Sequence, residues 1–290
     1  MEEPHFTNLA QARVAVVGLG LMGGSLALAL RGSCRALWGA DSDPAALAYA
    51  CQHGIIDEAV DFDAAQRADV LVLAAPVRAI LAQLARLAFG PAPAGPVLVL
   101  DLGSTKTDIA AAMRALPPGF APIGGHPMCG KEVSGVSHAD AGLFAGKVFV
   151  LTPLEQTPDW ALALARHLVL AVGARPLELT PERHDQLAAA ASHLPYLAAI
   201  GLVRAADGLG DEQVWQMVAS GFRDTSRLAA SDVTMMTDIL LTNRQAIAGA
   251  LGRYQAELAA LMALLDSGDA EALAAFLTLP AERRRGLFRP

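Results

Sequence analysis

The stretch Arg13-Val14-Ala15-Val16-Val17-Gly18-Leu19-Gly20-Leu21-Met22-Gly23 decides the fold of this chain. A short β-branched run ends at glycines spaced Gly-x-Gly-x-x-Gly, and an Ala/Leu-rich segment follows, which predicts a strand, a tight turn and a helix. Gly18 makes the turn, Gly20 lets a pyrophosphate approach the backbone, and Gly23 lets the helix pack closely on the strand. We therefore expect the start of the helix, with Leu21 and Met22, to bind the phosphates of a dinucleotide.

An acidic residue follows the next predicted strand, residues 36–40, and strengthens the dinucleotide prediction. Asp41 lies eighteen residues after Gly23, where a carboxylate accepts hydrogen bonds from the ribose hydroxyls and repels a 2′-phosphate. Asp43 precedes Pro44 and is the better N-cap for the following helix, so Asp41 is assigned to the ribose. This arrangement favours NAD over NADP.

Strands and helices then alternate as far as residue 179, and only helical patterns follow. The strand runs are unbroken and apolar, as expected for parallel strands that are buried on both faces. We predict an α/β Rossmann-type doubly wound NAD-binding domain over residues 1–179 and an all-helical substrate and dimerisation domain over residues 180–290. The further expected strands are residues 69–74, 97–101, the run leading to 126, 147–152 and 174–179; the expected helices include 44–53, 76–87, a helix to about 116, and 158–172.

Composition narrows the classes of partner. The chain of 290 residues has 53% hydrophobic residues, enough for a substantial core, but only 5% aromatic residues and a net charge of −7, which disfavours nucleic acid. Three cysteines without a CxxC pair and no signal peptide predict a cytoplasmic protein with no disulfides and no metal site. The uncharged runs at residues 14–30 and 186–203 are too short or too interrupted for a membrane span.

A glycine-flanked histidine in the stretch 123–135 is the first candidate for chemistry. Gly124 and Gly125 permit unusual backbone turns, and Pro127 biases His126 towards extended geometry, so the imidazole is aimed by the backbone. Such a histidine suits general base catalysis, although a histidine in a simple turn is the alternative. Ser104, in the strand-to-helix turn after residues 97–101, is equally compatible with contacting a ligand and with capping the next helix.

Two segments of the helical half carry polar groups among apolar neighbours. His184 and Asp185 precede Ser192-His193-Leu194-Pro195-Tyr196, and a second segment runs from Gly221 to Asp232 with several charged residues. Each segment alone is compatible with buried polar groups or ion pairs at helix ends. Together they supply donors and cations for a substrate that carries carboxylates, for which arginine is well suited.

Five motifs together resemble the prephenate dehydrogenase family, which includes the arogenate and cyclohexadienyl dehydrogenases of tyrosine biosynthesis. The resemblance covers nearly the whole chain. The motifs are Gly18-x-Gly20-x-x-Gly23, Asp101-x-Gly103-Ser104-x-Lys106, Gly124-Gly125-His126-Pro127-Met128-x-Gly130-x-Glu132-x-Ser134-Gly135, Ser192-His193-Leu194-Pro195, and Phe222-Arg223-Asp224-x-x-Arg227-x-Ala229-x-Ser231.

The resemblance implies NAD-dependent oxidative decarboxylation of prephenate to 4-hydroxyphenylpyruvate. Separately, the many apolar residues of the helical half predict a homodimer, because helices that bury more than one face need partners. The resemblance also implies that His126 accepts a hydrogen bond from the ring hydroxyl and that Ser104 and His193 lie near the substrate and nicotinamide. On the substrate side it places Arg227, which matches a carboxylate-binding arginine, and Ser231. Glu132 matches a glutamate that helps to close the site, and Asp185 and Asp224 match supporting groups.

Departures from the family pattern leave the substrate open. Tyr196 stands where many relatives repeat a histidine, and Met236 stands where tryptophan is common; both positions lie near the substrate side chain in such enzymes. Lys131 adds a cation beside Glu132, which we expect to disfavour the ammonium of arogenate and to favour prephenate. Arogenate or dual specificity remains the alternative. We expect no fused regulatory domain in this length, so any inhibition by tyrosine would act at the active site.

Two other classes of protein share part of this sequence pattern. A β-hydroxyacid dehydrogenase shares a Rossmann half and a helical half but uses a lysine of the helical half, whereas Lys106, Lys131 and Lys147 all precede residue 179. A non-catalytic NAD-binding redox sensor explains the glycine turn but leaves His126, His193 and Arg227 without a role.

Overall fold

The computed structural model describes residues 8–131 and 133–287. Contacts divide the chain into two compact units, Met1–Asn243 and Arg244–Pro290. The helices between residue 180 and Asn243 thus belong to the same unit as the sheet. The functional domain boundary at residue 179 stays a prediction.

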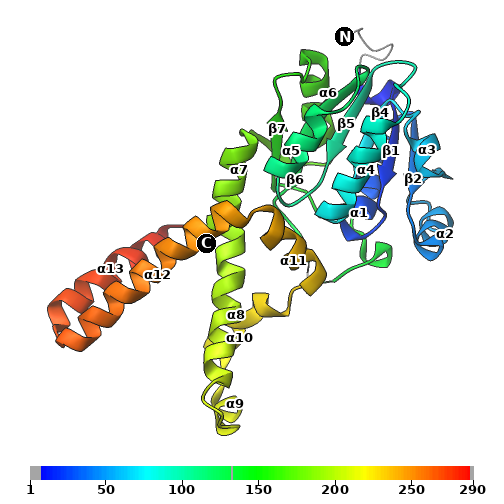
Figure 1. The fold of residues 1–290 in the computed structure, drawn as a ribbon. Coiled ribbons are helices and arrows are strands. Elements are labelled where there is room, and N and C mark those ends of the chain that lie inside the picture. The colour runs from blue at the N-terminus through cyan, green and yellow to red at the C-terminus, as the bar shows by residue number, and fades with distance from the viewer. Residues whose placement is uncertain (1–7, 132, 288–290) are drawn as a thin grey trace. The chain divides into compact units, whose positions relative to one another are not determined.

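A single sheet of eight strands organises the first unit (Figure 1), with the order β3-β2-β1-β4-β5-β6-β7-β8. Strand order reverses between β1 and β4, which is where doubly wound folds bind their ligands. β7 runs antiparallel to β6, whereas all other neighbours are parallel. The strands are β1 (Arg13–Val17), β2 (Ala36–Ala40), β3 (Glu58–Ala59), β4 (Val70–Leu73), β5 (Val97–Asp101), β6 (Phe120–Pro127), β7 (Val148–Pro153) and β8 (Arg175–Glu178).

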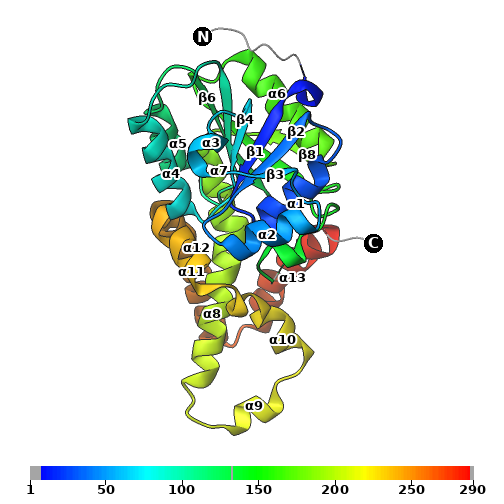
Figure 2. The same ribbon diagram turned by 90° about the vertical axis from the view of Figure 1, so that its right-hand side faces the viewer.

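Helices cover both faces of the sheet, as Figure 2 shows from the side. Alternate residues of β1 belong to different cores: Val14 and Val16 pack with α1 and α6, and Ala15 and Val17 pack with α4 and α5. The predicted doubly wound α/β class is therefore confirmed. The helices are η1 (Leu9–Gln11), α1 (Leu21–Leu30), α2 (Pro44–Gln52), α3 (Phe62–Ala65), α4 (Val77–Phe89), α5 (Thr107–Arg114), η2 (Val136–His138) and α6 (Asp159–Ala171).

Side-chain caps begin two of the helices, and the cap at Asp43 was predicted from the sequence. The Asp43 side chain accepts from Ala45 N–H at 2.9 Å, and the Thr180 hydroxyl accepts from Arg183 N–H at 3.2 Å. The short elements β3 and α3 were not expected, because two exposed strand residues and a single helical turn leave no periodic pattern.

One long helical segment, Pro181–Asp207, leaves the sheet (Figure 1) and contains α7 (Pro181–Ala188), the π-helical turn η3 (Ala189–His193) and α8 (Leu194–Asp207). Pro195 lacks the N–H that a regular helix needs, and the wider turn before it accommodates this loss. The segment is apolar enough to cross a membrane by length and composition, with a mean hydropathy of 1.3. However, His184, Asp185 and His193 within it are buried and hydrogen-bonded inside the first unit.

Four shorter elements complete the first unit. Of these, α10 and η4 contact α8, and α11 contacts α4. They are α9 (Gln213–Met217), α10 (Ser220–Ser226), η4 (Arg227–Ala230) and α11 (Val233–Thr242).

The second unit consists of α12 (Arg244–Ser267) and α13 (Ala270–Leu287). Apolar residues recur at helical spacing along α12, and three of them, Leu258, Met262 and Leu265, are 43%, 64% and 60% exposed. An apolar stripe of this kind is characteristic of a helix that packs against a partner.

Candidate active site

The turn after β1 has the geometry predicted for a dinucleotide site. Gly18 has a φ of +99°, and a Cβ at Gly23 would lie 1.9 Å from the Gly18 carbonyl oxygen. By contrast, a Cβ at Gly20 would meet no atom within 4 Å. The tight turn and the close helix packing therefore require Gly18 and Gly23, while the space above Gly20 is open for a pyrophosphate. Leu21 and Met22 begin α1 at this turn.

Asp41 lies beside the glycine turn, as a ribose-binding residue must. Its carboxylate accepts from Leu19 N–H at 2.6 Å and from Asp43 N–H at 2.8 Å. These contacts fix the carboxylate at the carboxyl end of β2, next to the turn that follows β1. The described residues therefore fit a dinucleotide, with Gly20 facing open space and Asp41 held ready for the ribose.

The turn after β5 is built differently from the turn after β1. The N-cap of α5 is Lys106, and its side chain caps nothing, so the alternative of Ser104 as the helix cap is wrong. The carboxylate of Asp185, from α7, takes that role: it accepts from Lys106 N–H at 2.7 Å and from Thr107 N–H at 2.8 Å. Ser104 itself is partly exposed in the turn, where contact with a ligand stays a prediction.

His126 lies inside β6 and pairs with Val150 of β7 rather than sitting in a loop. The flanking Gly124 and Gly125 have no positive φ, so the expectation that they supply unusual turns is wrong. They are required for space, since a Cβ at Gly124 would lie 2.1 Å from Thr152 Oγ1, and one at Gly125 would lie 2.6 Å from the Asp101 carbonyl oxygen. The glycines let β6 pass close to β5 and β7, which fixes His126 at the end of the sheet.

A hydrogen-bonded relay joins His126 to Asp185. His126 Nδ1 lies 2.8 Å from His184 Nε2, and His184 Nδ1 lies 2.8 Å from Asp185 Oδ1. His184 and Asp185 are buried, while His126 is partly exposed and forms the accessible end. The sequence indicated that His184 and Asp185 were unusual, and it did not predict that they contact His126.

A buried ion pair lies behind His126. Lys106 Nζ donates to Asp101 and to the carbonyl oxygen of Gly125, the latter at 2.7 Å. Asp101 also accepts from Gly103 N–H at 2.7 Å and from Gly125 N–H at 3.1 Å. The ion pair therefore holds the turn after β5 against Gly125, the residue that precedes His126. Both side chains are fully buried, so removing either one would leave an unpaired buried charge.

The surroundings of His126 favour its neutral form. The packed protein around the ring lowers the pKa of His126 well below its usual range, and the neighbouring His184, Lys106 and His193 lower that pKa further. Burial also lowers the pKa of His193 to about 4, although Asp185 opposes this shift. Burial alone would raise the pKa of Asp185, but the hydrogen bonds from His184, Thr107 and Lys106 lower it overall. The site thus combines neutral imidazoles with an ionised carboxylate.

His193 is joined to the same carboxylate residue through Asn243, which the sequence did not single out. Asn243 Nδ2 donates to the Asp185 backbone carbonyl at 2.9 Å and lies 3.2 Å from His193 Nδ1. Asn243 follows α11 as its C-cap and is buried. The structure therefore brings His126 and His193 together around Asp185.

Of the predicted substrate-side residues, Tyr196 joins a compact cluster, whereas Arg227 is exposed and Ser231 is partly exposed. Tyr196 packs with Met236 and Ile239 in a small apolar core, so the two positions that depart from the family pattern are neighbours. Arg227 is exposed at the start of η4, and the Ser231 hydroxyl donates to the Leu228 carbonyl oxygen at 2.8 Å.

Lys131 and Glu132 belong to the polar stretch after β6. Lys131 Nζ donates to Asp140 Oδ2 at 2.9 Å, and both side chains are nearly half exposed. The charge that was expected to act on the substrate is therefore shared with a carboxylate. Glu132 lies outside the described residues.

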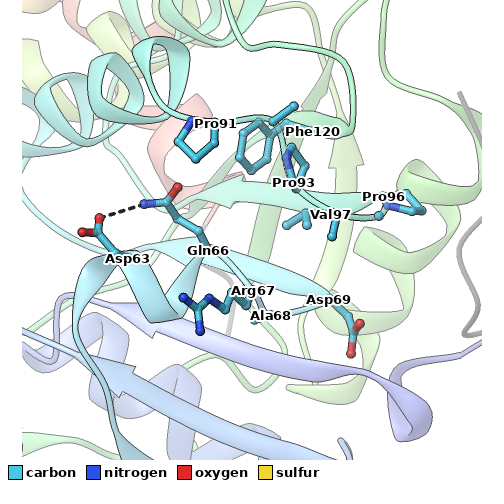
Figure 3. Close-up of a pocket in the computed structure, with 13 residues that line it drawn as sticks. Asp63, Gln66, Arg67, Ala68, Asp69, Pro91, Pro93, Pro96, Val97 and Phe120 are labelled. Carbon is cyan, nitrogen blue, oxygen red and sulfur yellow. Dashed lines mark hydrogen bonds between the residues drawn. The ribbon is translucent and has the colours of Figure 1, made fainter.

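A cavity of about 740 Å³ lies at the other end of the sheet and is not part of this site (Figure 3). Its lining includes Arg67, Asp69, Pro96 and Phe120, which lie at the starts of β4, β5 and β6. Ligands of doubly wound sheets bind at the carboxyl ends of the strands, where Gly18, Ser104 and His126 lie. We therefore place the candidate active site at the three neighbouring histidines, His126, His184 and His193, and not at this cavity.

A doubly wound sheet with this glycine turn, an acidic residue after β2 and a neutral histidine at the carboxyl end defines a dinucleotide-dependent oxidoreductase. Two family models match the chain: the prephenate dehydrogenase nucleotide-binding domain over residues 26–178 and the prephenate dehydrogenase dimerization domain over residues 180–279. The chain belongs to the prephenate dehydrogenase family, as the sequence motifs predicted.

Individual relatives support the assignment along the whole chain. A prephenate dehydrogenase of Bacillus subtilis is 32% identical over 290 residues, covering 97% of this chain and 77% of the relative. A crystal structure of prephenate dehydrogenase from A. aeolicus with hydroxyphenyl propionate and NAD+ is 30% identical, with a TM-score of 0.89 and coverage of 97% and 99%. Synechocystis arogenate dehydrogenase is 32% identical, with a TM-score of 0.83 and coverage of 95% and 100%. The predicted enzyme class and NAD as cofactor are confirmed.

Proposed function

We propose that this chain catalyses the NAD-dependent oxidative decarboxylation of prephenate to 4-hydroxyphenylpyruvate in tyrosine biosynthesis. The observation that carries the proposal is the neutral, partly exposed His126 at the end of the buried relay, beside a turn built for a dinucleotide. Membership of the prephenate dehydrogenase family supplies the substrate class.

His126 acts as the hydrogen-bond acceptor for the ring hydroxyl. As the hydroxyl oxygen forms a carbonyl, the C4–H bond breaks and its electron pair leaves as hydride; bound NAD supplies the hydride acceptor. The bond to the ring carboxylate then breaks, carbon dioxide leaves, and its electron pair makes the ring aromatic. The carbonyl oxygen recovers its proton from His126, which returns to its neutral form. A histidine with a lowered pKa suits this role, because it is already unprotonated at neutral pH.

The remaining assigned residues bind and orient the substrate. Arg227 holds a substrate carboxylate through its planar guanidinium, with Ser231 nearby in the chain. Ser104 and His193 flank the reacting ring, Tyr196 contacts the substrate side chain, and Glu132 helps to close the site.

The test is NADH formation by the purified protein with NAD and prephenate, repeated with His126→Asn. The variant should lose about 10²- to 10⁴-fold in kcat, the usual contribution of a positioned general base. Its affinity for NAD should stay unchanged, because the glycine turn is a separate structure. His138→Asn, at the exposed η2 turn, is the control. Turnover that survives in His126→Asn would reject the role of His126, and NAD binding with no turnover of prephenate or arogenate would reject the activity.

Prephenate and arogenate must be compared directly, because a relative of similar identity is an arogenate dehydrogenase. The two substrates differ only in the side chain, which carries a keto or an amino group. Tyr196 and Met236 form one cluster and are the positions that depart from the family pattern. We expect higher kcat/KM for prephenate, and expect Tyr196→His to change the ratio between the substrates. A preference for arogenate in the natural protein would overturn the substrate assignment.

We also propose that the protein is a cytoplasmic homodimer that associates through its helical domain, residues 180–290. The support is the description of the matching family model as a dimerization domain, together with the exposed apolar stripe on α12. Light scattering should give twice the chain mass of 30.1 kDa, and a monomer at working concentration would reject the dimer.

A further inference from the structure

Every hydrogen bond around Asp185 has a forced direction, and this determines where the imidazole protons are. The carboxylate faces the backbone N–H groups of Lys106 and Thr107, which can only donate. Because these groups begin α5, their partial positive charge favours the ionised carboxylate. An ionised carboxylate can only accept, so His184 Nδ1, at 2.8 Å, must carry a proton.

The proton position on His184 in turn determines which nitrogen of His126 is the donor. When His184 is neutral, with its proton on Nδ1, its Nε2 carries a lone pair and lies 2.8 Å from His126 Nδ1. In this form of His184, His126 Nδ1 is the donor. The lone pair of neutral His126 is then on Nε2, the nitrogen that this relay does not use.

A second chain of hydrogen bonds begins at the backbone carbonyl of Asp185 and leads through Asn243 to His193. It places the proton of His193 on the other ring nitrogen. The carbonyl can only accept, so the Asn243 atom at 2.9 Å from it must be the amide nitrogen, whichever way the amide was first placed. That nitrogen is also 3.2 Å from His193 Nδ1 and can only donate to it. His193 Nδ1 therefore carries the lone pair, and a neutral His193 has its proton on Nε2.

We propose that Asp185 fixes the two site histidines in opposite tautomers: His126 protonated on Nδ1, through His184, and His193 protonated on Nε2, through Asn243. His184, Asp185 and Asn243 are thus positioning residues for the reaction, and this significance rests on the proposed function. His126 presents an acceptor to the ring hydroxyl, whereas His193 presents a donor suited to an oxygen atom of the substrate or the cofactor. The wrong tautomer of His126 would present N–H to a hydroxyl hydrogen and could not take its proton.

The direct test is the protonation pattern of the histidine nitrogens in the substrate-free protein. Long-range proton–nitrogen NMR of ¹⁵N-histidine-labelled protein at neutral to mildly alkaline pH distinguishes a protonated ring nitrogen from one with a lone pair. Single replacements of His126, His184 and His193 by Gln assign the signals, with His167→Gln on the exposed side of α6 as a control. We expect His126 and His184 to be protonated on Nδ1 and His193 on Nε2. A proton on Nε2 of His126 or on Nδ1 of His193 would overturn the proposal.

Asn243→Asp tests one path while leaving the other intact. The carboxyl group has the same shape, but the atom facing His193 becomes an oxygen that can accept, so His193 should move its proton to Nδ1 while His126 keeps its pattern. We expect kcat to fall by at least about tenfold, as for the loss of a hydrogen bond that orients a reacting group. An unchanged His193 pattern in folded Asn243→Asp would contradict the proposal.

Paired variants of His184 test the other path. His184→Gln can still accept from His126 Nδ1 and should retain more activity than His184→Leu, which cannot. His184→Leu should also show His126 protonated partly on Nε2, with NAD affinity unchanged. Equal activity of the two folded variants, with His126 unchanged in both, would contradict the proposal. Because the spectra need no substrate, the tautomers can be correct in a protein that fails to turn over prephenate, and a failure of either idea can be told from a failure of the other.

Discussion

The helices α1 and α5 both begin at the carboxyl end of the sheet, and the backbone N–H groups at each start attract a negative charge. The two helix starts use this attraction for different anions. At α1 the N-cap is Gly20, without a side chain, and the space above it is open. At α5 the backbone N–H groups of Lys106 and Thr107 already bind the carboxylate of Asp185. Both helix ends favour a negative charge. The first is available for the phosphates of NAD, and the second holds the chain's own anion, which orients the site histidines.

The comparison predicts that the two helix starts fail in different ways when they are changed. The largest effect should follow Asp185→Asn, which keeps the shape of the side chain but removes its charge. The side chain facing His184 can then donate as well as accept, so the tautomer of His126 is no longer fixed. We expect kcat to fall by about 10²-fold or more, because only one tautomer of His126 can act as the general base. Steady-state kinetics with prephenate measures this, alongside NAD titration.

Asp238→Asn is the matched control for Asp185→Asn. Asp238 is another buried carboxylate of the same unit, and it pairs with Arg78 rather than with the relay. Its loss should reduce stability without the same fall in kcat. Equal effects of the two substitutions on kcat would show that Asp185 matters only for folding.

At α1, the two glycines should separate binding from stability. Gly23→Ala places a Cβ against the Gly18 carbonyl oxygen and should cost about 1–3 kcal/mol of folding free energy, as overpacking does, while also weakening NAD binding. Gly20→Ala meets no protein atom, so it should leave the melting temperature close to that of the natural protein and weaken NAD binding by about tenfold or more. Thermal melts and NAD titration check both. Unchanged NAD affinity in Gly20→Ala would contradict the placement of the pyrophosphate.

Stability and activity should both decrease in acid, because the folded protein lowers the pKa values of His126 and His193. His126 and His193 have folded-state pKa values below their unfolded values, so in this range the unfolded chain binds more protons and stability rises with pH. The free energy of unfolding should therefore fall as the pH drops from about 6.5, the usual pKa of histidine, towards about 4. Denaturant titrations at several pH values measure it, and a flat profile would contradict the lowered pKa values.

The pH profile of kcat/KM should decline on its acid side, because His126 must be neutral to accept the proton. The apparent pKa of this decline should lie below the usual pKa range of histidine. The charged and titratable groups around it come from three elements: His184 and Asp185 of α7, Lys106 and Asp101 of the β5–α5 turn, and His193 of η3. An apparent pKa of this decline at or above about 6.5, the usual pKa of histidine, would contradict the electrostatic account.

The smallest effect is expected at Lys131, outside both helix starts. Lys131 pairs with Asp140 at the surface, so Lys131→Met should leave stability unchanged and raise the share of arogenate turnover only slightly. Asp140→Asn leaves Lys131 without this partner and should increase discrimination against arogenate. Substrate competition assays compare the two. An opposite order would reject any role of the lysine in substrate choice.

The contrast between the helix starts also explains what the sequence could predict. Gly18, Gly20, Gly23 and Asp41 act within one strand–turn–helix unit and its neighbour, so their spacing carries the information, as it does for the caps Asp43 and Thr180. The cap of α5 comes from Asp185, which is 79 positions from Lys106, and no local pattern shows that contact. From its position in the sequence Ser104 was a reasonable candidate for the cap of α5, but the carboxylate of Asp185 in α7 binds the N–H groups there.

The sequence named four residues of the histidine site, His126, His184, Asp185 and His193, but it did not predict Asn243 or the contacts among these residues. His126 and His193 were identified from motifs, but the link from Asn243 to His193 spans 50 positions and depends on how α11 ends beside α7 and η3. Gly124 and Gly125 illustrate a related limit: the sequence predicted unusual turns at these glycines, whereas the neighbouring strands show that the glycines are needed for space.

The most direct test of the account is to measure NAD affinity and kcat for Gly20→Ala and Asp185→Asn in parallel. We expect opposite patterns: Gly20→Ala weakens NAD binding and retains kcat at saturating NAD, whereas Asp185→Asn retains NAD binding and loses kcat. If Asp185→Asn weakened NAD binding as much as Gly20→Ala did, the two helix starts would not have separate functions and the account would be wrong.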